Sequence, residues 1–92
     1  MRVTLKLIGD LAEIVREKEL VFPSQEMRFG EFVQFLSDRY GEVLREHLLP
    51  SGRHYKHYAI LLNGANILRL GEMEAAVRDG DTIAVLTLVT GG

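Results

Sequence analysis

The chain begins and ends with stretches whose polarity pattern is typical of β-strands. In residues 1–8 apolar positions alternate with polar ones, as in a half-buried strand, until Gly9-Asp10 breaks the pattern. Residues 82–89 form an apolar stretch that follows the turn residues Asp79-Gly80-Asp81. Because these two strands are the most apolar of the chain, we expect them at the centre of a sheet.

Between these strands the sequence predicts one long amphipathic helix. From Phe29 to Tyr40 apolar residues recur at three- and four-residue spacing, and charged residues fall on the opposite side. Gly41 is expected to end the helix. Apolar positions in residues 43–49 predict a second helical turn before Pro50.

Further strands are expected over residues 19–22 and 58–63, with a short extended piece at 66–68. The segments 11–19, 51–57 and 71–77 are expected to form loops or single turns. A helix placed among strands in this order predicts an α+β fold, in which a mixed sheet of four to five strands carries one main helix on one face.

A chain of 92 residues predicts a single domain, which we assign to residues 1–89, with residues 90–92 as a flexible tail. A chain this short leaves little room for a deep catalytic cleft. The formal net charge of −2 disfavours a dedicated DNA-binding or RNA-binding protein, which usually carries a clear basic excess.

Composition also limits the compartment and the chemistry. The chain has no cysteine, which excludes disulfides, a thiolate nucleophile and cysteine-based zinc sites. Charged residues interrupt every apolar run in the first twenty residues, so we expect no signal peptide. No stretch approaches the ~18 apolar residues of a membrane span. We therefore expect a cytoplasmic protein with no membrane partner.

Strand parity predicts a surface for partner proteins. Ile83 and Val85 fit the core face of the last strand, so the residues between and after them point to the other face. Ile60 and Leu62 occupy the same core positions in the neighbouring strand, which leaves Ala59 and Leu61 outside. The expected partner-binding residues are Leu61, Ala84, Leu86, Leu88, Val89 and Thr90. The alternative is a second small core covered by residues 41–57.

Histidines and charged residues in the segment before residue 58 give a weaker signal. His47, His54 and His57 lack the carboxylates and convergent spacing of a metal site, so no metal is expected. With Arg53 and Lys56 they form a small basic patch that could meet an acidic partner or an RNA phosphate. An exposed loop is the simpler interpretation.

Two segments resemble a known family. They are LLNGANI, residues 61–67, and the last fourteen residues, DGDTIAVLTLVTGG. Both are similar to the MoaD/ThiS family of ubiquitin-like sulfur-carrier proteins, and the terminus is most like that of the small subunit of molybdopterin synthase, MoaD. The resemblance implies a β-grasp, or ubiquitin-like, fold over the whole chain.

The resemblance also implies chemistry at the terminal Gly91-Gly92. A free carboxylate is a poor acyl donor, because its leaving group would be an oxide. In this family an E1-like partner enzyme adenylates the C-terminal carboxylate with ATP, and sulfur then displaces AMP to give a thiocarboxylate. The carboxylate would be that of Gly92. Gly91 would thread the partner's channel, since a residue without a Cβ fits a narrow passage. The chain itself would bind no cofactor and supply no catalytic side chain.

The acceptor of the sulfur is left open by the sequence. The leading hypothesis is a pterin precursor bound by the large subunit of molybdopterin synthase, during molybdenum or tungsten cofactor biosynthesis. The same carrier chemistry would serve tRNA thiolation, cysteine synthesis or thiamin synthesis. A different class of function is a ubiquitin-like modifier whose activated carboxyl is joined to lysines of other proteins. The fourth hypothesis is an interaction domain with an inert tail.

Overall fold

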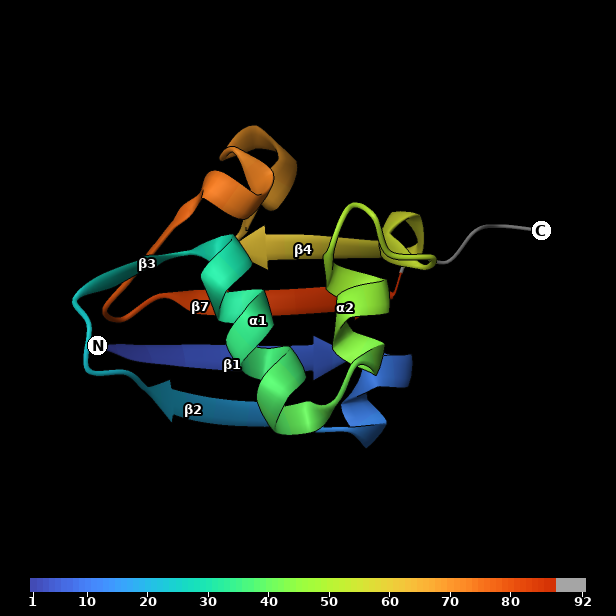
Figure 1. Ribbon diagram of the computed structural model, residues 1–92, viewed down its shortest axis with the longest axis horizontal. Coiled ribbons are helices and arrows are strands. Elements are labelled where there is room, and N and C mark those ends of the chain that lie inside the picture. Colours follow the sequence, from blue (N-terminus) through green and yellow to red (C-terminus); the bar gives the residue numbers. More distant parts are fainter. Residues whose placement is uncertain (88–92) are drawn as a thin grey trace.

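The computed structural model of the chain describes residues 1–87, and its centre is a five-stranded mixed sheet (Figure 1). Across the sheet the strands are β2 (Glu17–Val21), β1 (Arg2–Ile8), β7 (Thr82–Thr87), β4 (Tyr58–Leu62) and β5 (Ala65–Asn66). Strands β1 and β7 are parallel and lie at the centre, and the other neighbours are antiparallel. The mixed sheet and the central position of the two most apolar strands are confirmed.

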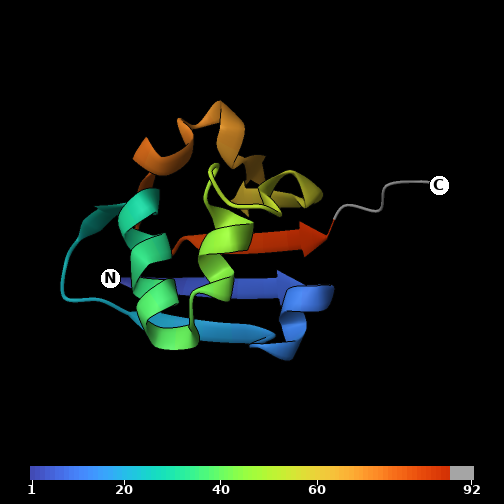
Figure 2. The same ribbon diagram turned by 45° about the vertical axis from the view of Figure 1, so that its right-hand side comes forward.

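Two α-helices lie on one face of this sheet (Figures 1 and 2). Helix α1 (Phe29–Tyr40) begins after Arg28, whose backbone N–H donates to the Glu31 carboxylate at 3.1 Å. This bond satisfies an amide at the helix start where no Ser or Thr side chain is present. The helix ends at Gly41, which has a φ of +109° and donates to the Ser37 carbonyl.

The core lies between the sheet and the helices. Buried residues of β1, β4 and β7 meet the apolar stripe of α1, where Phe29, Phe32 and Leu36 are fully buried. Helix α2 (Val43–Leu48) adds Leu44 and Leu48 to the same cluster. The idea that residues 41–57 cover a second core on the opposite face is therefore wrong.

The sequence missed two strands that lie outside the main sheet. Strands β3 (Glu26–Arg28) and β6 (Ala76–Arg78) pair antiparallel as a separate two-stranded sheet. Residues 71–77 are therefore only partly the expected loop: a 3₁₀ turn, η4 (Glu72–Glu74), leads directly into β6. Three-residue strands give too short an alternation to be read from a sequence.

Other boundaries differ by a few residues. The second strand starts two residues earlier than expected, at Glu17, and ends at Val21. The extended piece after the Asn63-Gly64 turn is already strand at Ala65 and ends at Asn66. The side-chain oxygen of Asn66 accepts a hydrogen bond from the backbone N–H of Leu68 at 3.0 Å and so starts the 3₁₀ turn η3 (Ile67–Arg69). The remaining 3₁₀ turns are η1 (Asp10–Glu13) and η2 (Tyr55–His57).

The predicted strand over residues 82–89 is described as far as Thr87. The end of that strand, the assigned domain boundary at residue 89 and the predicted tail over residues 90–92 lie outside the described residues. Within residues 1–87, no helix has the length and apolar character needed to cross a membrane.

Candidate functional site

The chain leaves the sheet toward its terminus at the carboxyl end of β7. Because β1 and β7 are parallel, the residues after β1 lie beside the last residue of β7. This last residue, Thr87, is also paired with Tyr58 at the start of β4. Three segments distant in sequence therefore surround the point from which residues 88–92 continue.

Thr87 is held by the loop that follows β1. Its hydroxyl donates to the Ile8 carbonyl at 3.3 Å and accepts from the Asp10 amide at 3.4 Å. Gly9, with a φ of +89°, lies directly against it, and a Cβ at Gly9 would come 2.1 Å from the Thr87 hydroxyl oxygen. Glycine is therefore required here both by the backbone conformation and by the close approach. The contacts fix the position at which the chain leaves the sheet.

An apolar patch covers part of the face of the sheet opposite the helices. Leu86 lies between Ile8 on β1 and Ala59 on β4, and Ala84 lies next to Leu61. We call these five residues the apolar patch. Ile8 is 51% exposed and the other four are half-buried. Both α-helices lie on the other face, so neither covers the patch (Figures 1 and 2).

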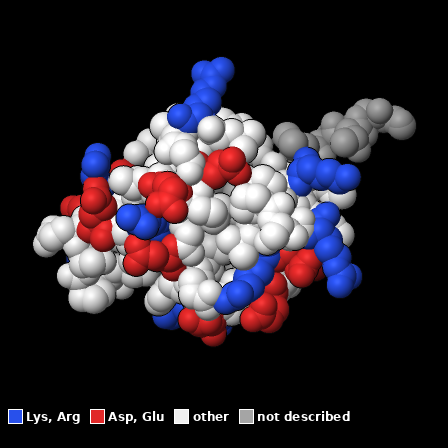
Figure 3. Space-filling model, turned by 45° about the horizontal axis from the view of Figure 1, so that its top comes forward, with Lys and Arg blue, Asp and Glu red and all other residues white. Residues whose placement is uncertain are grey.

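Charged residues border the patch on the side of β2. Lys6 lies next to Ala84 and pairs with Glu17 at 3.9 Å. Further from the patch on the same face, Arg2 pairs with Glu19 at 3.3 Å, and all four side chains are largely exposed. Such exposed pairs contribute little to stability. An apolar centre with a charged border is the usual composition of a protein interface. On the face shown in Figure 3, acidic and basic side chains are likewise interspersed.

The structure brings together the predicted docking residues that it describes, Leu61, Ala84 and Leu86. The other predicted site residues, Leu88, Val89, Thr90, Gly91 and Gly92, lie outside the described residues. Strand parity identifies the outward-facing residues correctly, including Ala59. Ile8 was missed, because its place beside Leu86 depends on the parallel pairing of β1 with β7.

The three histidines gather where α2, η2 and β4 meet. The ring centroids of His47 and His54 are 5.0 Å apart, and those of His54 and His57 are 5.8 Å apart. His47 is half-buried and packs edge-on against Tyr58. Residues 1–87 contain no group of three or more His, Cys, Asp or Glu placed to hold a metal ion. Near His47, the rings of His54 and His57 lie in the exposed loop that the sequence indicates.

Two tyrosines near this cluster have raised pKa values. Burial and a hydrogen bond from its hydroxyl to Glu72 raise the pKa of Tyr55 to about 12. Burial, with a smaller effect of the Asp10 carboxylate, also raises the pKa of Tyr58. Both phenols are protonated at neutral pH, so neither can act as a general base there.

Comparisons with known proteins agree with this geometry. A profile of the ThiS family matches residues 5–92. The chain is 27% identical to small archaeal modifier protein 3 of Haloferax volcanii in an alignment of 93 positions that covers all of both chains. Its fold resembles that of Urm1 from Trypanosoma brucei, with a TM-score of 0.76 at 20% identity, covering 99% of this chain and 95% of that one.

A further similar structure is the complex of subunits 1 and 2 of the molybdopterin-converting factor from Helicobacter pylori. The match has a TM-score of 0.63 at 25% identity and covers all of both chains. These likenesses confirm the β-grasp, ubiquitin-like fold. The members of this group are small ubiquitin-like carrier proteins that are generally not catalytic. The profile match over nearly the whole length shows that the chain belongs to the ThiS family of ubiquitin-like sulfur carriers and modifiers.

Proposed function

We propose that this protein is a sulfur carrier whose C-terminal carboxylate, on Gly92, is the reacting group. The observation that carries the proposal is the family match, which extends through the terminal Gly91-Gly92. A carboxylate oxygen attacks the α-phosphorus of ATP and releases pyrophosphate, which gives an acyl adenylate. Hydrosulfide, as the sulfur nucleophile, then attacks the acyl carbon and releases AMP and a proton, which leaves a thiocarboxylate. ATP is bound by the activating enzyme and no cofactor by the carrier.

The geometry at the end of β7 supports this role. Thr87 is fixed to the loop after β1, five residues before the terminus. The apolar patch lies beside it and offers a surface on which an E1-like adenylating enzyme docks while the terminal glycines enter the active site. With two glycines, only backbone has to pass through the enzyme's channel. Leu88, Val89 and Thr90, which follow Thr87 in the sequence, are further predicted interface residues.

For the acceptor, we propose a pterin precursor bound by the large subunit of molybdopterin synthase. The supporting observation is the similarity to the Helicobacter pylori complex, in which subunits 1 and 2 of the molybdopterin-converting factor are assembled. The carrier would then be the small subunit of a synthase and would itself contribute no catalytic side chain. The use of ATP fits the cytoplasmic location expected from the sequence.

A second candidate is conjugation to other proteins. It is favoured by the 27% identity to a small archaeal modifier protein over the full length of both chains. In this case a lysine amine, rather than sulfur destined for a small molecule, attacks the activated Gly92 carbonyl. Sulfur transfer to tRNA, cysteine or thiamin precursors uses the same activated terminus as the first candidate.

The test is intact-mass analysis of the chain after incubation with ATP, an E1-like activating enzyme and a sulfur source. The expected change is the exchange of one oxygen for one sulfur at Gly92. A chain lacking Gly91-Gly92 is the control and should stay unchanged. An unchanged mass of the full chain, with an enzyme proven competent on another carrier, would refute the proposal.

The acceptor is tested in a second step. Adding the large subunit and the pterin precursor should return the thiocarboxylate to a carboxylate. Conjugate ladders in cell extracts that vanish on deletion of Gly91-Gly92 would instead favour the modifier.

A further inference from the structure

The parallel ladder between β1 and β7 has a regular direction of hydrogen bonds. The Thr4 N–H donates to the Asp81 carbonyl at 2.9 Å. In a parallel ladder this step repeats at every second residue of both strands. Three steps further along, the regular ladder would join the Asp10 N–H to the Thr87 carbonyl.

A side-chain contact takes the place of that last step. The Asp10 N–H donates to the Thr87 hydroxyl at 3.4 Å, and the same hydroxyl donates to the Ile8 carbonyl at 3.3 Å. We call these two hydrogen bonds the Thr87 bridge. The regular pairing ends at Ile8 with Leu86, and Gly9 turns the chain with a φ of +89°. The hydroxyl of Thr87 therefore holds the end of β7 to the loop after β1.

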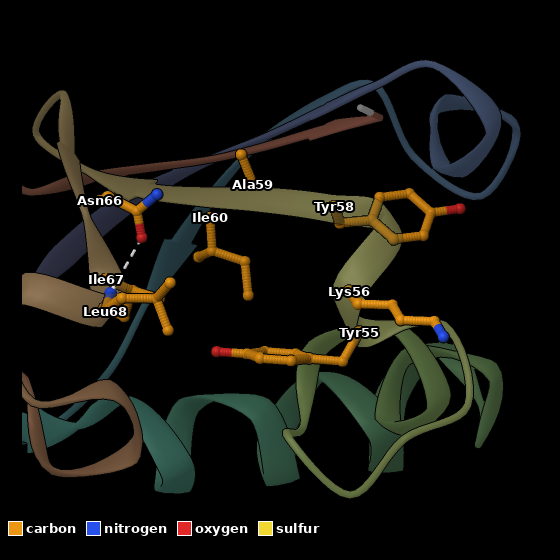
Figure 4. Close-up of a pocket in the computed structure, with 8 residues that line it drawn as sticks. All are labelled: Tyr55, Lys56, Tyr58, Ala59, Ile60, Asn66, Ile67 and Leu68. Carbon is orange, nitrogen blue, oxygen red and sulfur yellow. Dashed lines mark hydrogen bonds between the residues drawn. The ribbon is translucent and has the colours of Figure 1, made fainter. Parts of the chain in front are cut away.

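On its other side, Thr87 lies opposite β4 without a ladder bond. The Asn63 N–H donates to the Thr82 carbonyl at 2.8 Å, and such bonded pairs alternate with unbonded pairs in an antiparallel ladder. The pair of Thr87 with Tyr58 is an unbonded one, and the Tyr58 N–H donates to the Tyr55 carbonyl instead. In Figure 4 Tyr58 stands at the start of β4, and its ring points in the opposite direction from that of Tyr55. The direction of the chain at Thr87 is therefore set from the β1 side, by the Thr87 bridge.

The short distance from Thr87 to the terminus makes this direction important. Five residues follow Thr87 in the sequence. A segment of five residues spans at most about 17 Å when fully extended, so a change of roughly 30° in direction at its start can displace its end by about 9 Å. A misplacement of about 1 Å at a reacting group can lower a rate on the order of a hundredfold. The direction in which the chain leaves the sheet therefore bears on the reaction at Gly92.

Neighbouring residues of β7 thus have separate tasks. Leu86 belongs to the apolar patch, on which a partner docks in the proposed function. Docking on the patch holds the folded domain, whereas the Thr87 bridge holds the point from which the remaining residues start. Fixing this point before docking removes conformational freedom that the complex would otherwise have to remove.

We propose that Thr87 is a positioning residue for the reaction at Gly92: its hydroxyl bridge to the loop after β1 sets the direction in which the chain leaves the sheet, and this lowers the entropic cost of bringing the terminal carboxylate to ATP. The role rests on the proposed adenylation of Gly92. Thr87 acts through the chain and not by contact with the reacting atoms.

The test compares two variants of the full chain that differ in the hydroxyl. T87V replaces the hydroxyl by a methyl group of similar size, and T87S keeps the hydroxyl. Steady-state pyrophosphate release, with ATP and an E1-like activating enzyme, gives kcat and the KM for the carrier. T87V should lower kcat about fivefold, the lower end of the cost of ordering the backbone of one residue. KM should stay nearly unchanged because the apolar patch is intact, and T87S should behave like the wild-type protein.

Hydrogen exchange checks the bridge independently of the reaction. The Asp10 amide should exchange faster in T87V than in the wild-type protein or T87S, because it loses its acceptor. T82V is the matched control, since it removes a hydroxyl from the first residue of β7, at the other end of the strand. It should change neither the Asp10 exchange nor kcat. If circular dichroism shows that T87V does not fold, T87A against T87S makes the same comparison.

The wild-type protein separates this role from the proposed function. If it releases no pyrophosphate with an enzyme proven competent on another carrier, the proposed adenylation fails, and the positioning role fails with it. With an active wild-type protein, an unchanged kcat or an unchanged Asp10 exchange in T87V would overturn the positioning role alone. A higher KM at unchanged kcat would overturn it too, because Thr87 would then belong to the docking surface. Equal losses of kcat in T82V or T87S would have the same meaning for the hydroxyl bridge.

Discussion

The two faces of the five-stranded sheet are built from the same strands and have opposite properties. On the helix face, Leu5, Ile83 and Val85 are between 0% and 1% exposed. On the other face, their sequence neighbours Ala84 and Leu86 are half-buried and border the 51%-exposed Ile8. Because successive side chains of a strand point to opposite faces, neighbouring residues of β7 lie alternately in a closed core and on an open apolar surface.

This difference shows where stability and recognition reside in so small a protein. The helix face is closed by α1 and α2, whose buried apolar residues pack against those of the sheet. On the open face, apolar side chains remain exposed to solvent, and neither α-helix packs against them. An exposed apolar surface next to the end of β7 is characteristic of a docking site rather than of a surface that stabilises the fold.

The largest expected effect is a difference in stability between two β7 variants, one on each face of the sheet. I83A removes fully buried side-chain volume and should lower the free energy of unfolding by about 2–5 kcal/mol. L86A, three residues further along β7, should lower it by less than about 1 kcal/mol. Urea denaturation of both variants measures the difference. Equal losses would mean that the apolar patch is part of the core.

The next effect concerns the loop that joins the two faces at the end of β1. G9A should destabilise the fold by roughly 1–3 kcal/mol, because a Cβ there has an unfavourable φ and overlaps the Thr87 side chain. G41A is the matched control, since Gly41 has a φ of +109° with nothing within 4 Å of its Cβ position. It should retain only the backbone cost.

The double variant G9A/T87A isolates the overlap at Gly9. Removing the Thr87 hydroxyl and methyl should recover part of the stability lost in G9A. Thermal denaturation of the two single variants and of the double variant provides the measurement. No recovery in the double variant would show that the backbone conformation alone accounts for the loss.

Those contacts also mark the limit of what the sequence could predict. Period-two and period-four patterns identify the central strands, the long helix and the outward parity of Leu61, Ala84 and Leu86. They depend only on neighbours along the chain. Two features depend instead on the parallel pairing of β1 with β7, which joins residues almost eighty positions apart. They are the position of Ile8 in the apolar patch and the close contact of Gly9 with Thr87.

The sequence did not predict the short strands for a different reason. Strands β3 and β6 have three residues each and are held by pairing with each other, not by a pattern of their own. The pairing of β5 with β4 at only two positions could not be foreseen either, because it ends where the chain turns from Asn66 into η3. The terminal chemistry, in contrast, depends on a family resemblance and not on any pattern in the fold.

The third prediction places a charge on the open face without disturbing the closed one. L86D should raise the KM of adenylation by the E1-like enzyme about tenfold, with kcat almost unchanged, since it weakens docking rather than the reaction. V21D, on the same face but 67% exposed and at the opposite end of the sheet, should leave KM unchanged. Steady-state pyrophosphate release measures both.

An equal rise of KM in V21D would mean that the docking surface is not confined to the apolar patch. The folded fraction of each variant is checked by circular dichroism. A normal KM in L86D would remove the patch from the proposed interface.

The smallest effect tests the hydrogen bond between Tyr55 on η2 and Glu72 on η4. Y55F removes the hydrogen bond to Glu72 and should lower the free energy of unfolding at neutral pH by about 0.5–1.5 kcal/mol. Since the pKa of Tyr55 rises from 10.0 to about 12 on folding, the unfolded chain releases this proton first as the pH rises. The stabilisation is complete below pH 10 and is lost between pH 10 and about 12. The stability difference between the wild-type protein and Y55F should therefore shrink over this interval, as urea denaturation at several alkaline pH values would show. A difference that stays constant to pH 12 would mean that the Tyr55 hydroxyl is equally hydrated in both states and that Glu72 does not hold the Tyr55 ring in place.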